Sequence, residues 1–156
     1  MDHLRSCTSG RFSMQRLSRL AIWLMASSLC AALPAFAALP GTLPPAQTHG
    51  VVTYVSGGIG QKEIRAFEAA ARQYPLDLEF AIKHAPRAEF TADVHVTITD
   101  AQGQRVLDTQ SAGPFLLAKL PAGRYTVTAE QQQHTLTRTV QVATHTPTHV
   151  MFLWPA

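Results

Sequence analysis

The sequence predicts a mainly β protein: an antiparallel β-sandwich with one N-terminal amphipathic helix, preceded by a signal peptide. Two patterns carry the fold prediction. After residue 75, apolar residues recur at every second position in a series of short segments. Turn residues separate these segments at the spacing typical of a sandwich. The strand–helix–strand rhythm of a parallel nucleotide-binding sheet is missing from the sequence.

The predicted elements begin with a strand at residues 49–56, which is rich in β-branched residues. The glycines of residues 57–60 end this strand. A helix is expected over 61–74, because its apolar residues lie three or four apart, and Pro75 ends it. The remaining strands, about eight in all with the first, are expected at 76–83, 92–99, 105–107, 115–120, 125–130, 134–142 and 149–155.

Two glycines are assigned to turns between these strands. Gly103 closes the turn that begins at Asp100, and Gly123 closes a second tight turn, where it is free to take a positive φ. One strand departs from simple alternation, because Arg138 falls on the same face as its apolar residues. We favour an edge strand whose Arg138 reaches solvent, and a β-bulge that shifts the register is the alternative.

The N-terminal region predicts export. An apolar stretch at residues 20–37 follows four arginines and ends in Ala-Phe-Ala, so residues 1–37 are typical of a secretory signal peptide cut between Ala37 and Ala38. The apolar stretch is too short to anchor the chain, so contact with the membrane is expected only transiently, during export. We therefore expect a periplasmic or secreted protein.

The mature chain divides into a tether and one domain. Residues 38–48 contain three prolines and are expected to form a flexible tether, and 49–156 form the domain. Both cysteines, Cys7 and Cys30, lie in the leader, which leaves the mature chain without a disulfide or a thiolate ligand. Outside the leader, Lys and Arg balance Asp and Glu at nine each, so no basic surface for nucleic acid is expected.

A sequence signature points to a known fold. The turn Asp100–Gly103 is followed by Leu-Pro-Ala-Gly-Arg-Tyr-Thr-Val-Thr-Ala at 120–129 and by a strand at 137–142. This pattern resembles carboxypeptidase regulatory-like domains, which are transthyretin-like (Ig-like) sandwiches, over about residues 88–156. The resemblance implies the fold and a role as an accessory module. The preceding portion is similar to small exported bacterial proteins that carry such a domain.

The resemblance does not imply a peptidase. A metallocarboxypeptidase holds zinc in a separate catalytic domain through a His-x-x-Glu pair. None of the six histidines outside the leader has a glutamate three residues later. We expect no catalytic, cofactor or metal residues. The expected function is a non-enzymatic binding or structural module of the bacterial cell envelope, which engages an envelope protein through a sheet edge or loops.

The alternative function is binding of a small ligand or a metal ion. His134, His145 and His149 are the candidate ligands. His145 and His149 lie about 13 Å apart if the segment between them is extended, which is too far for one ion. We therefore favour solvated histidines.

Two other candidate sites have plain structural alternatives. The Gly57–Gly60 loop precedes a helix and could bind an anion there, but Glu63 opposes one, so we favour a hinge. His95 and Asp93 share the polar face of a strand and could form an acid–base pair. Since the sequence nominates no nucleophile for them, a solvated sheet face is the favoured interpretation.

The aromatic residues near the C-terminus are a further candidate. Phe115, Phe152 and Trp154 could form a stacking platform, but Phe152 and Trp154 share one face of a strand and so favour the core. Met151 and Leu153 lie on the opposite face. They either meet the helix or form an exposed interaction patch.

Overall fold

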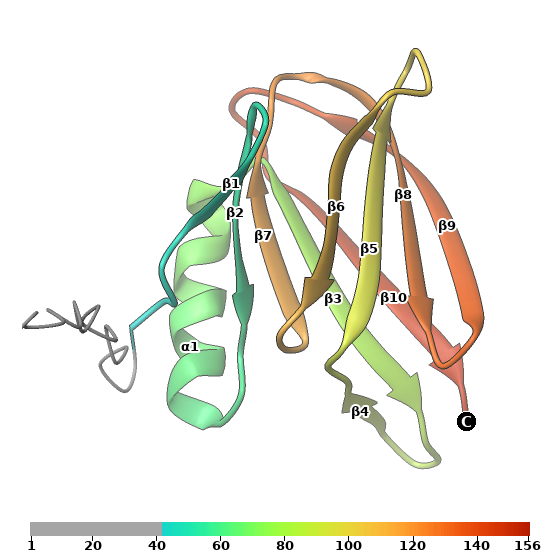
Figure 1. Ribbon diagram of the computed structural model, residues 1–156. Helices are drawn as coiled ribbons and strands as arrows, with labels where there is room; N and C mark the ends of the chain where they lie inside the picture. Colours follow the sequence, from blue (N-terminus) through green and yellow to red (C-terminus); the bar gives the residue numbers. More distant parts are fainter. Residues whose placement is uncertain (1–41) are drawn as a thin grey trace, which may run out of the picture. The chain divides into compact units, whose positions relative to one another are not determined.

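The computed structural model describes residues 42–156, which form two β-sheets and one α-helix (Figure 1). The expected signal peptide at 1–37, its cleavage site at Ala37 and Ala38, and residues 38–41 of the expected tether lie outside the described residues. Between residues 42 and 156, no helix is long and apolar enough to cross a membrane.

The helix and several strands have the expected positions. In chain order the elements are β1 (Gln47–His49), β2 (Val52–Gly57), α1 (Gln61–Ala70), a 3-10 helix (Ala71–Gln73), β3 (Leu76–Lys83), β4 (Ala88–Phe90), β5 (Val94–Asp100), β6 (Arg105–Ser111), β7 (Phe115–Lys119), β8 (Gly123–Gln131), β9 (His134–Val142) and β10 (Thr148–Pro155). Strands β3 and β9 have the predicted bounds. The short strands β1 and β4 were not predicted as separate strands.

The strands form two packed sheets. The first has the order β1-β2-β7-β3-β10, with β4 also paired to β3, and the second has the order β6-β5-β8-β9. This two-sheet arrangement confirms a mainly β, sandwich-like architecture with one helix. The prediction of an antiparallel sandwich holds for every described strand pair except one, since β10 runs parallel to β3 over eight register pairs. The reason is that the chain crosses from the second sheet to the first between β9 and β10, so no hairpin forces an antiparallel pair.

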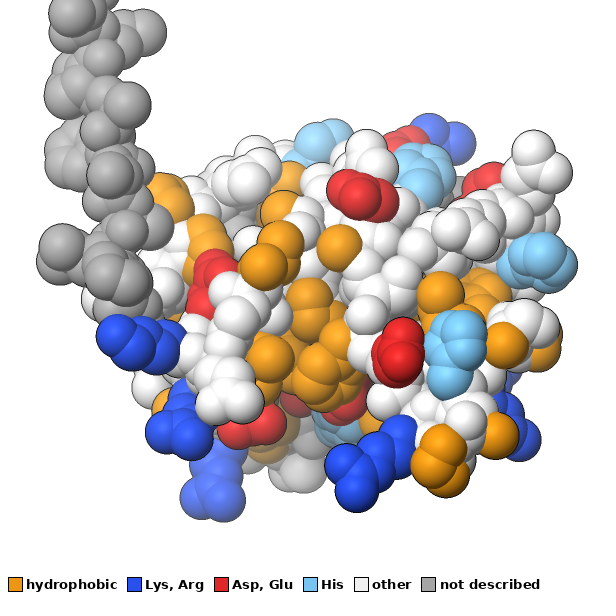
Figure 2. All heavy atoms as spheres, turned by 90° about the horizontal axis from the view of Figure 1, so that it is seen from below, with side chains coloured by type: hydrophobic (Ala, Val, Ile, Leu, Met, Phe, Trp, Pro, Cys, Tyr) orange, Lys and Arg blue, Asp and Glu red, His pale blue; other side chains and the backbone are white. Residues whose placement is uncertain are grey.

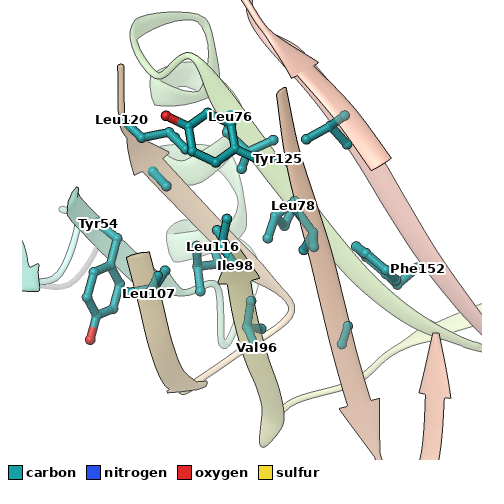
Figure 3. Packing of buried hydrophobic residues seen from close by; sticks show 14 of the residues in the cluster. Tyr54, Leu76, Leu78, Val96, Ile98, Leu107, Leu116, Leu120, Tyr125 and Phe152 are labelled. Atoms are coloured by element: carbon teal, nitrogen blue, oxygen red, sulfur yellow. The ribbon is translucent and has the colours of Figure 1, made fainter. Parts of the chain in front are cut away.

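The main core lies between the two sheets. Figure 3 shows Leu78, Val96 and Ile98 in this core, and all three are fully buried. In each of these strands the core residues lie at every second position, so one face of each sheet supplies the core. Phe152 and Trp154 are also buried here, which confirms the favoured core interpretation.

A second, smaller core lies on the opposite face of the first sheet. Helix α1 packs there through Phe67 and Ala70 against Val55 of β2 and against Phe115 and Leu117 of β7. The rings of Phe67 and Phe115 stack with their centroids 5.8 Å apart. Phe115 is therefore separated by the sheet from Phe152 and Trp154, and the three do not form one platform.

Strand β9 is an edge strand. Its register against β8 is unbroken from Gly123–Val142 to Gln131–His134, and Arg138 is exposed. This confirms the favoured interpretation of Arg138. The β-bulge alternative is wrong for β9, and the irregularity in this sheet lies instead between β5 and β6, at Ile98 and Thr99.

The described part of the expected tether is structured. Leu43 packs against the second core, and Gln47–His49 form β1, which pairs with β2. The prediction of a flexible tether is therefore wrong for these residues. Prolines obscured the pattern, and a three-residue strand is too short to show alternation.

The two turn glycines differ. Gly103 has a φ of 79°, and its N–H donates a hydrogen bond to the Asp100 carbonyl. Gly123 does not take the expected positive φ and is the first residue of β8. The turn before β8 is held by Tyr125 instead, whose hydroxyl donates a 2.9 Å hydrogen bond to the Pro121 carbonyl.

Candidate functional site

Helix α1 covers only part of the outer face of the first sheet. It packs on β2 and β7, whereas the outward residues of β3 and β10 lie beside it. The parallel register pairs His149 with Asp77, Met151 with Glu79, and Leu153 with Ala81. We call this surface the ledge, and its residues are Asp77, Glu79, Ala81, His149, Met151 and Leu153.

A cavity of about 220 Å³ lies where the ledge meets the helix. We call it the acidic pocket because three of its lining residues carry carboxylates. Its lining residues come from α1, the adjoining 3-10 helix and four strands, and they are Phe67, Glu68, Ala71, Asp77, Glu79, Phe90, Phe115 and His149.

His149 contacts both carboxylates of β3. Its Nδ1 lies 2.8 Å from Asp77 Oδ2, and its Nε2 lies 3.4 Å from Glu79 Oε2. Asp77 is only 9% exposed, and no donor within the described residues reaches its buried Oδ1. Leaving a buried acceptor without a hydrogen bond costs about 1–3 kcal/mol. Asp77 therefore brings to the pocket a carboxylate in which one oxygen has no hydrogen-bond donor among the described residues.

Burial also affects Glu79. Desolvation raises the pKa of its carboxyl above the usual value, and the neighbouring Asp77 and Glu68 act in the same direction. The opposing influence is His149, which lowers the pKa. The pocket thus concentrates negative charge that is only partly compensated, and it is suited to binding a cation.

The pocket borders an exposed apolar surface. Phe90, Met151 and Leu153 are 50%, 44% and 39% exposed. Ala81 of β3 pairs with Phe90 of β4 on one side and with Leu153 of β10 on the other. These two large side chains therefore flank a small one. Figure 2, which views the end of the domain that carries β4, shows hydrophobic side chains gathered among charged ones. Met151 and Leu153 therefore belong to an exposed patch, one of the two expected alternatives.

The three candidate histidines have separate surroundings. His134 contacts the Gln132 carbonyl, His145 lines a different cavity near Arg72, and His149 lies in the acidic pocket. Among residues 42–156, no three His, Cys, Asp or Glu side chains are arranged to hold a metal ion. The structure does not bring the three histidines together.

The Gly57–Gly60 loop is occupied by the protein's own carboxylate. Glu63 Oε2 accepts a 2.9 Å hydrogen bond from the Ile59 N–H, in the region where an anion would bind. A Cβ on Gly58 would lie 2.4 Å from the Phe115 ring, so close packing excludes a side chain there. The arrangement gives the anion-site hypothesis no support.

His95 pairs with Asp108 and not with Asp93, its partner in the alternative interpretation. Its Nε2 lies 2.6 Å from Oδ1 of Asp108 on the neighbouring strand β6, and this hydrogen bond is the main cause that lowers the Asp108 pKa. Both side chains lie on the outer face of the second sheet. Within the described residues no hydrogen bond joins His95 to Asp93, and His95 is exposed, in agreement with the favoured interpretation of a solvated sheet face.

Sequence reasoning missed the acidic residues of the pocket. Asp77 and Glu79 were placed on the polar side of an alternating strand, and Glu68 on the helix surface was not considered. Among the pocket residues, sequence reasoning considered His149 as a candidate ligand, but together with His134 and His145 instead of Asp77 and Glu79.

No protein-family model matches this chain, and comparison with curated proteins finds no match. The class of protein is therefore defined by fold and site: a mainly β, two-sheet domain with an acidic pocket beside its single helix. The function has to be proposed from the geometry of that pocket and of the ledge.

Proposed function

We propose that this protein is a non-enzymatic, exported binding module of the bacterial cell envelope, and that it engages a protein partner through the ledge. The observation that carries the proposal is the exposed group Phe90, Met151 and Leu153 next to the nearly buried carboxylate of Asp77. Exposed apolar side chains beside an unsatisfied polar group are typical of a surface that a partner covers.

The finer fold assignment is part of this proposal. We assign the domain to the carboxypeptidase regulatory-like, transthyretin-like (Ig-like) group. Two observations support the assignment: two packed sheets, and the Tyr125 hydroxyl bonded to Pro121 within the signature segment. Export is proposed from the leader at residues 1–37.

The ledge is a better binding surface than the sheet edges. Side chains tie the edges of the two sheets to each other on both sides of the sandwich. On one side, Trp154 Nε1 of β10 donates a 2.9 Å hydrogen bond to the His134 carbonyl of β9. On the other side, His49 Nδ1 of β1 lies 3.2 Å from the Val106 carbonyl oxygen of β6. A partner strand would have to compete with these contacts.

Site-specific crosslinking in living cells tests this proposal. A photoreactive amino acid replaces Met151 in the full-length, C-terminally tagged chain, and Thr139 is replaced in a matched control. Thr139 is also exposed and on an edge strand, but in the second sheet. We expect a specific protein adduct in the envelope fraction from position 151 only. If position 151 yields no adduct, or the same adducts as position 139, the proposal is wrong.

A further inference from the structure

We propose that the acidic pocket receives a positively charged side chain, lysine or arginine, from the partner, and that apolar residues adjacent to it in the partner cover Met151 and Leu153 of the ledge. This inference rests on the proposed function and specifies the chemistry of the partner at that site.

The first argument is the balance of charge and hydrogen bonds. Glu68 of α1 and Asp77 and Glu79 of β3 bring three carboxylates to one cavity, with His149 as the basic side chain among its lining residues. His149 reaches Oδ2 of Asp77 and leaves Oδ1 buried without a partner. A positively charged N–H donor compensates the charge of these carboxylates, since hydrogen bonds in which the donor or the acceptor is ionised are about twice as strong as neutral ones.

The second argument is the aromatic wall of the pocket. Phe67, Phe90 and Phe115 line one cavity, and the rings of Phe90 and Phe115 have centroids 5.3 Å apart. A metal ion has no apolar part that could pack against such walls. The alkyl part of a lysine or arginine packs against them, and its charged end interacts favourably with ring faces. The lining therefore selects an organic cation.

The third argument concerns size and continuity. At about 220 Å³, the cavity is smaller than the roughly 300–1,000 Å³ that small-molecule sites usually occupy. It accommodates a side chain, and the remainder of the ligand has to lie outside. The adjacent surface is apolar, because Met151 is the register partner of Glu79 and Leu153 follows on the same face. A polypeptide in which a basic residue lies beside apolar ones fits the acidic pocket and the apolar surface next to it.

Binding of defined peptides to the exported, purified chain tests the inference. The probes are acetyl-Leu-Arg-Leu-amide, its glutamine counterpart acetyl-Leu-Gln-Leu-amide, and acetyl-Arg-amide, which carries the same single guanidinium without flanking apolar residues. NMR titration reports both affinity and location. We expect the arginine peptide to bind at least tenfold more tightly than either other probe and to shift signals of Asp77, Glu79 and Met151. Equal binding of the glutamine peptide, or of acetyl-Arg-amide, overturns the inference.

Two variants with a matched control locate the charge. Asp77→Asn and Glu79→Gln keep the side-chain shape, and each is expected to weaken the arginine peptide at least tenfold. Two variants are used because Asp77→Asn alone could impair folding. Asp108→Asn also removes one carboxylate, but from the outer face of the second sheet, and is expected to leave affinity unchanged. If both pocket variants bind like the wild type, the inference fails.

The crosslinking experiment separates this inference from the proposed function. When the Met151 adduct forms equally well in chains that carry Asp77→Asn or Glu79→Gln, the binding module stands and the basic side chain is excluded. When the otherwise unchanged chain forms no adduct, both proposals fail. If the adduct is weaker in both pocket variants, the result supports both proposals.

Discussion

His149 Nδ1 lies 2.8 Å from Asp77 Oδ2, although 72 residues separate the two in the sequence. The contact exists because β10 joins β3 in parallel and the register places residue 149 beside residue 77. It connects the edge strand of the first sheet to the nearly buried carboxylate of the acidic pocket. The same pair therefore affects both stability and binding.

Replacing His149 should destabilise the fold. His149→Ala leaves Oδ2 of Asp77 without its donor, next to an Oδ1 that already has none, and a loss of about 1–3 kcal/mol is expected from the desolvated carboxylate. Urea denaturation measures this loss. His145→Ala is the control, because His145 is exposed between β9 and β10, and it should change stability little. Equal effects of the two substitutions would contradict the role assigned to His149.

Stability should depend on pH through Glu79. Its pKa in the folded protein is raised above 4.5, mainly by burial and then by Asp77 and Glu68, with His149 opposing, so the folded state binds its proton more tightly than the unfolded state. Glu79 therefore favours folding at acid pH, and this contribution is lost as pH rises from about 4.5 through the folded pKa.

Glu79→Gln removes this dependence. The free energy of unfolding of the variant should rise relative to the wild type as pH increases across that window, and urea denaturation at several pH values measures the difference. A constant difference across the window would show that Glu79 does not titrate as described.

The hydroxyl of Tyr125 should contribute measurably to stability. Tyr125→Phe removes its hydrogen bond to the Pro121 carbonyl, and a loss of about 0.5–1.5 kcal/mol is expected. Tyr74→Phe is a matched control, because no hydrogen bond from the Tyr74 hydroxyl is found within the described residues and its ring still faces Lys119. Thermal and urea denaturation should place the Tyr74 variant close to the wild type. If the two variants are equally stable, the turn does not depend on the hydroxyl.

Two glycines should respond differently to a methyl group. A Cβ on Gly113 would lie 2.3 Å from the Gly57 carbonyl oxygen, which is backbone and cannot move away cheaply. Gly113→Ala should therefore cost about 1–3 kcal/mol or more. A Cβ on Gly123 would meet only the Tyr125 ring, at an ordinary 3.5 Å. Gly123→Ala should stay within about 0.5 kcal/mol of the wild type. If Gly123→Ala lost as much stability as Gly113→Ala, the backbone at Gly123 would have a requirement for glycine that steric contact does not explain.

The strands were predictable where side chains alternate over a full strand. Strand β3 has the predicted bounds because its eight residues alternate regularly, and β9 also has them although Arg138 interrupts its apolar face. Strand β4 was not predicted, because its three exposed residues show no alternation of apolar and polar side chains. Helix α1 begins where predicted, after the glycine loop, and its last expected turn is a 3-10 helix.

The site was much less predictable than the strands. In β3, alternation assigns Asp77 to the polar face, but it says nothing of what packs on that face. The burial of Asp77 depends on where α1 lies and on the parallel partner β10, and both are long-range consequences of the fold. His149 was identified as a candidate, yet its partners lie some 70 residues away, and local spacing suggested other histidines instead.

The parallel pairing of β10 with β3 also determines when, during synthesis, the ledge can form. Strand β10 follows the nine other described strands in the chain, and it contributes His149, Met151 and Leu153 to the ledge. A chain that leaves the ribosome N-terminal end first has no complete ledge until β10 has appeared. Contacts between such distant segments also form slowly. Recognition through this surface therefore requires that β10 has already paired with β3.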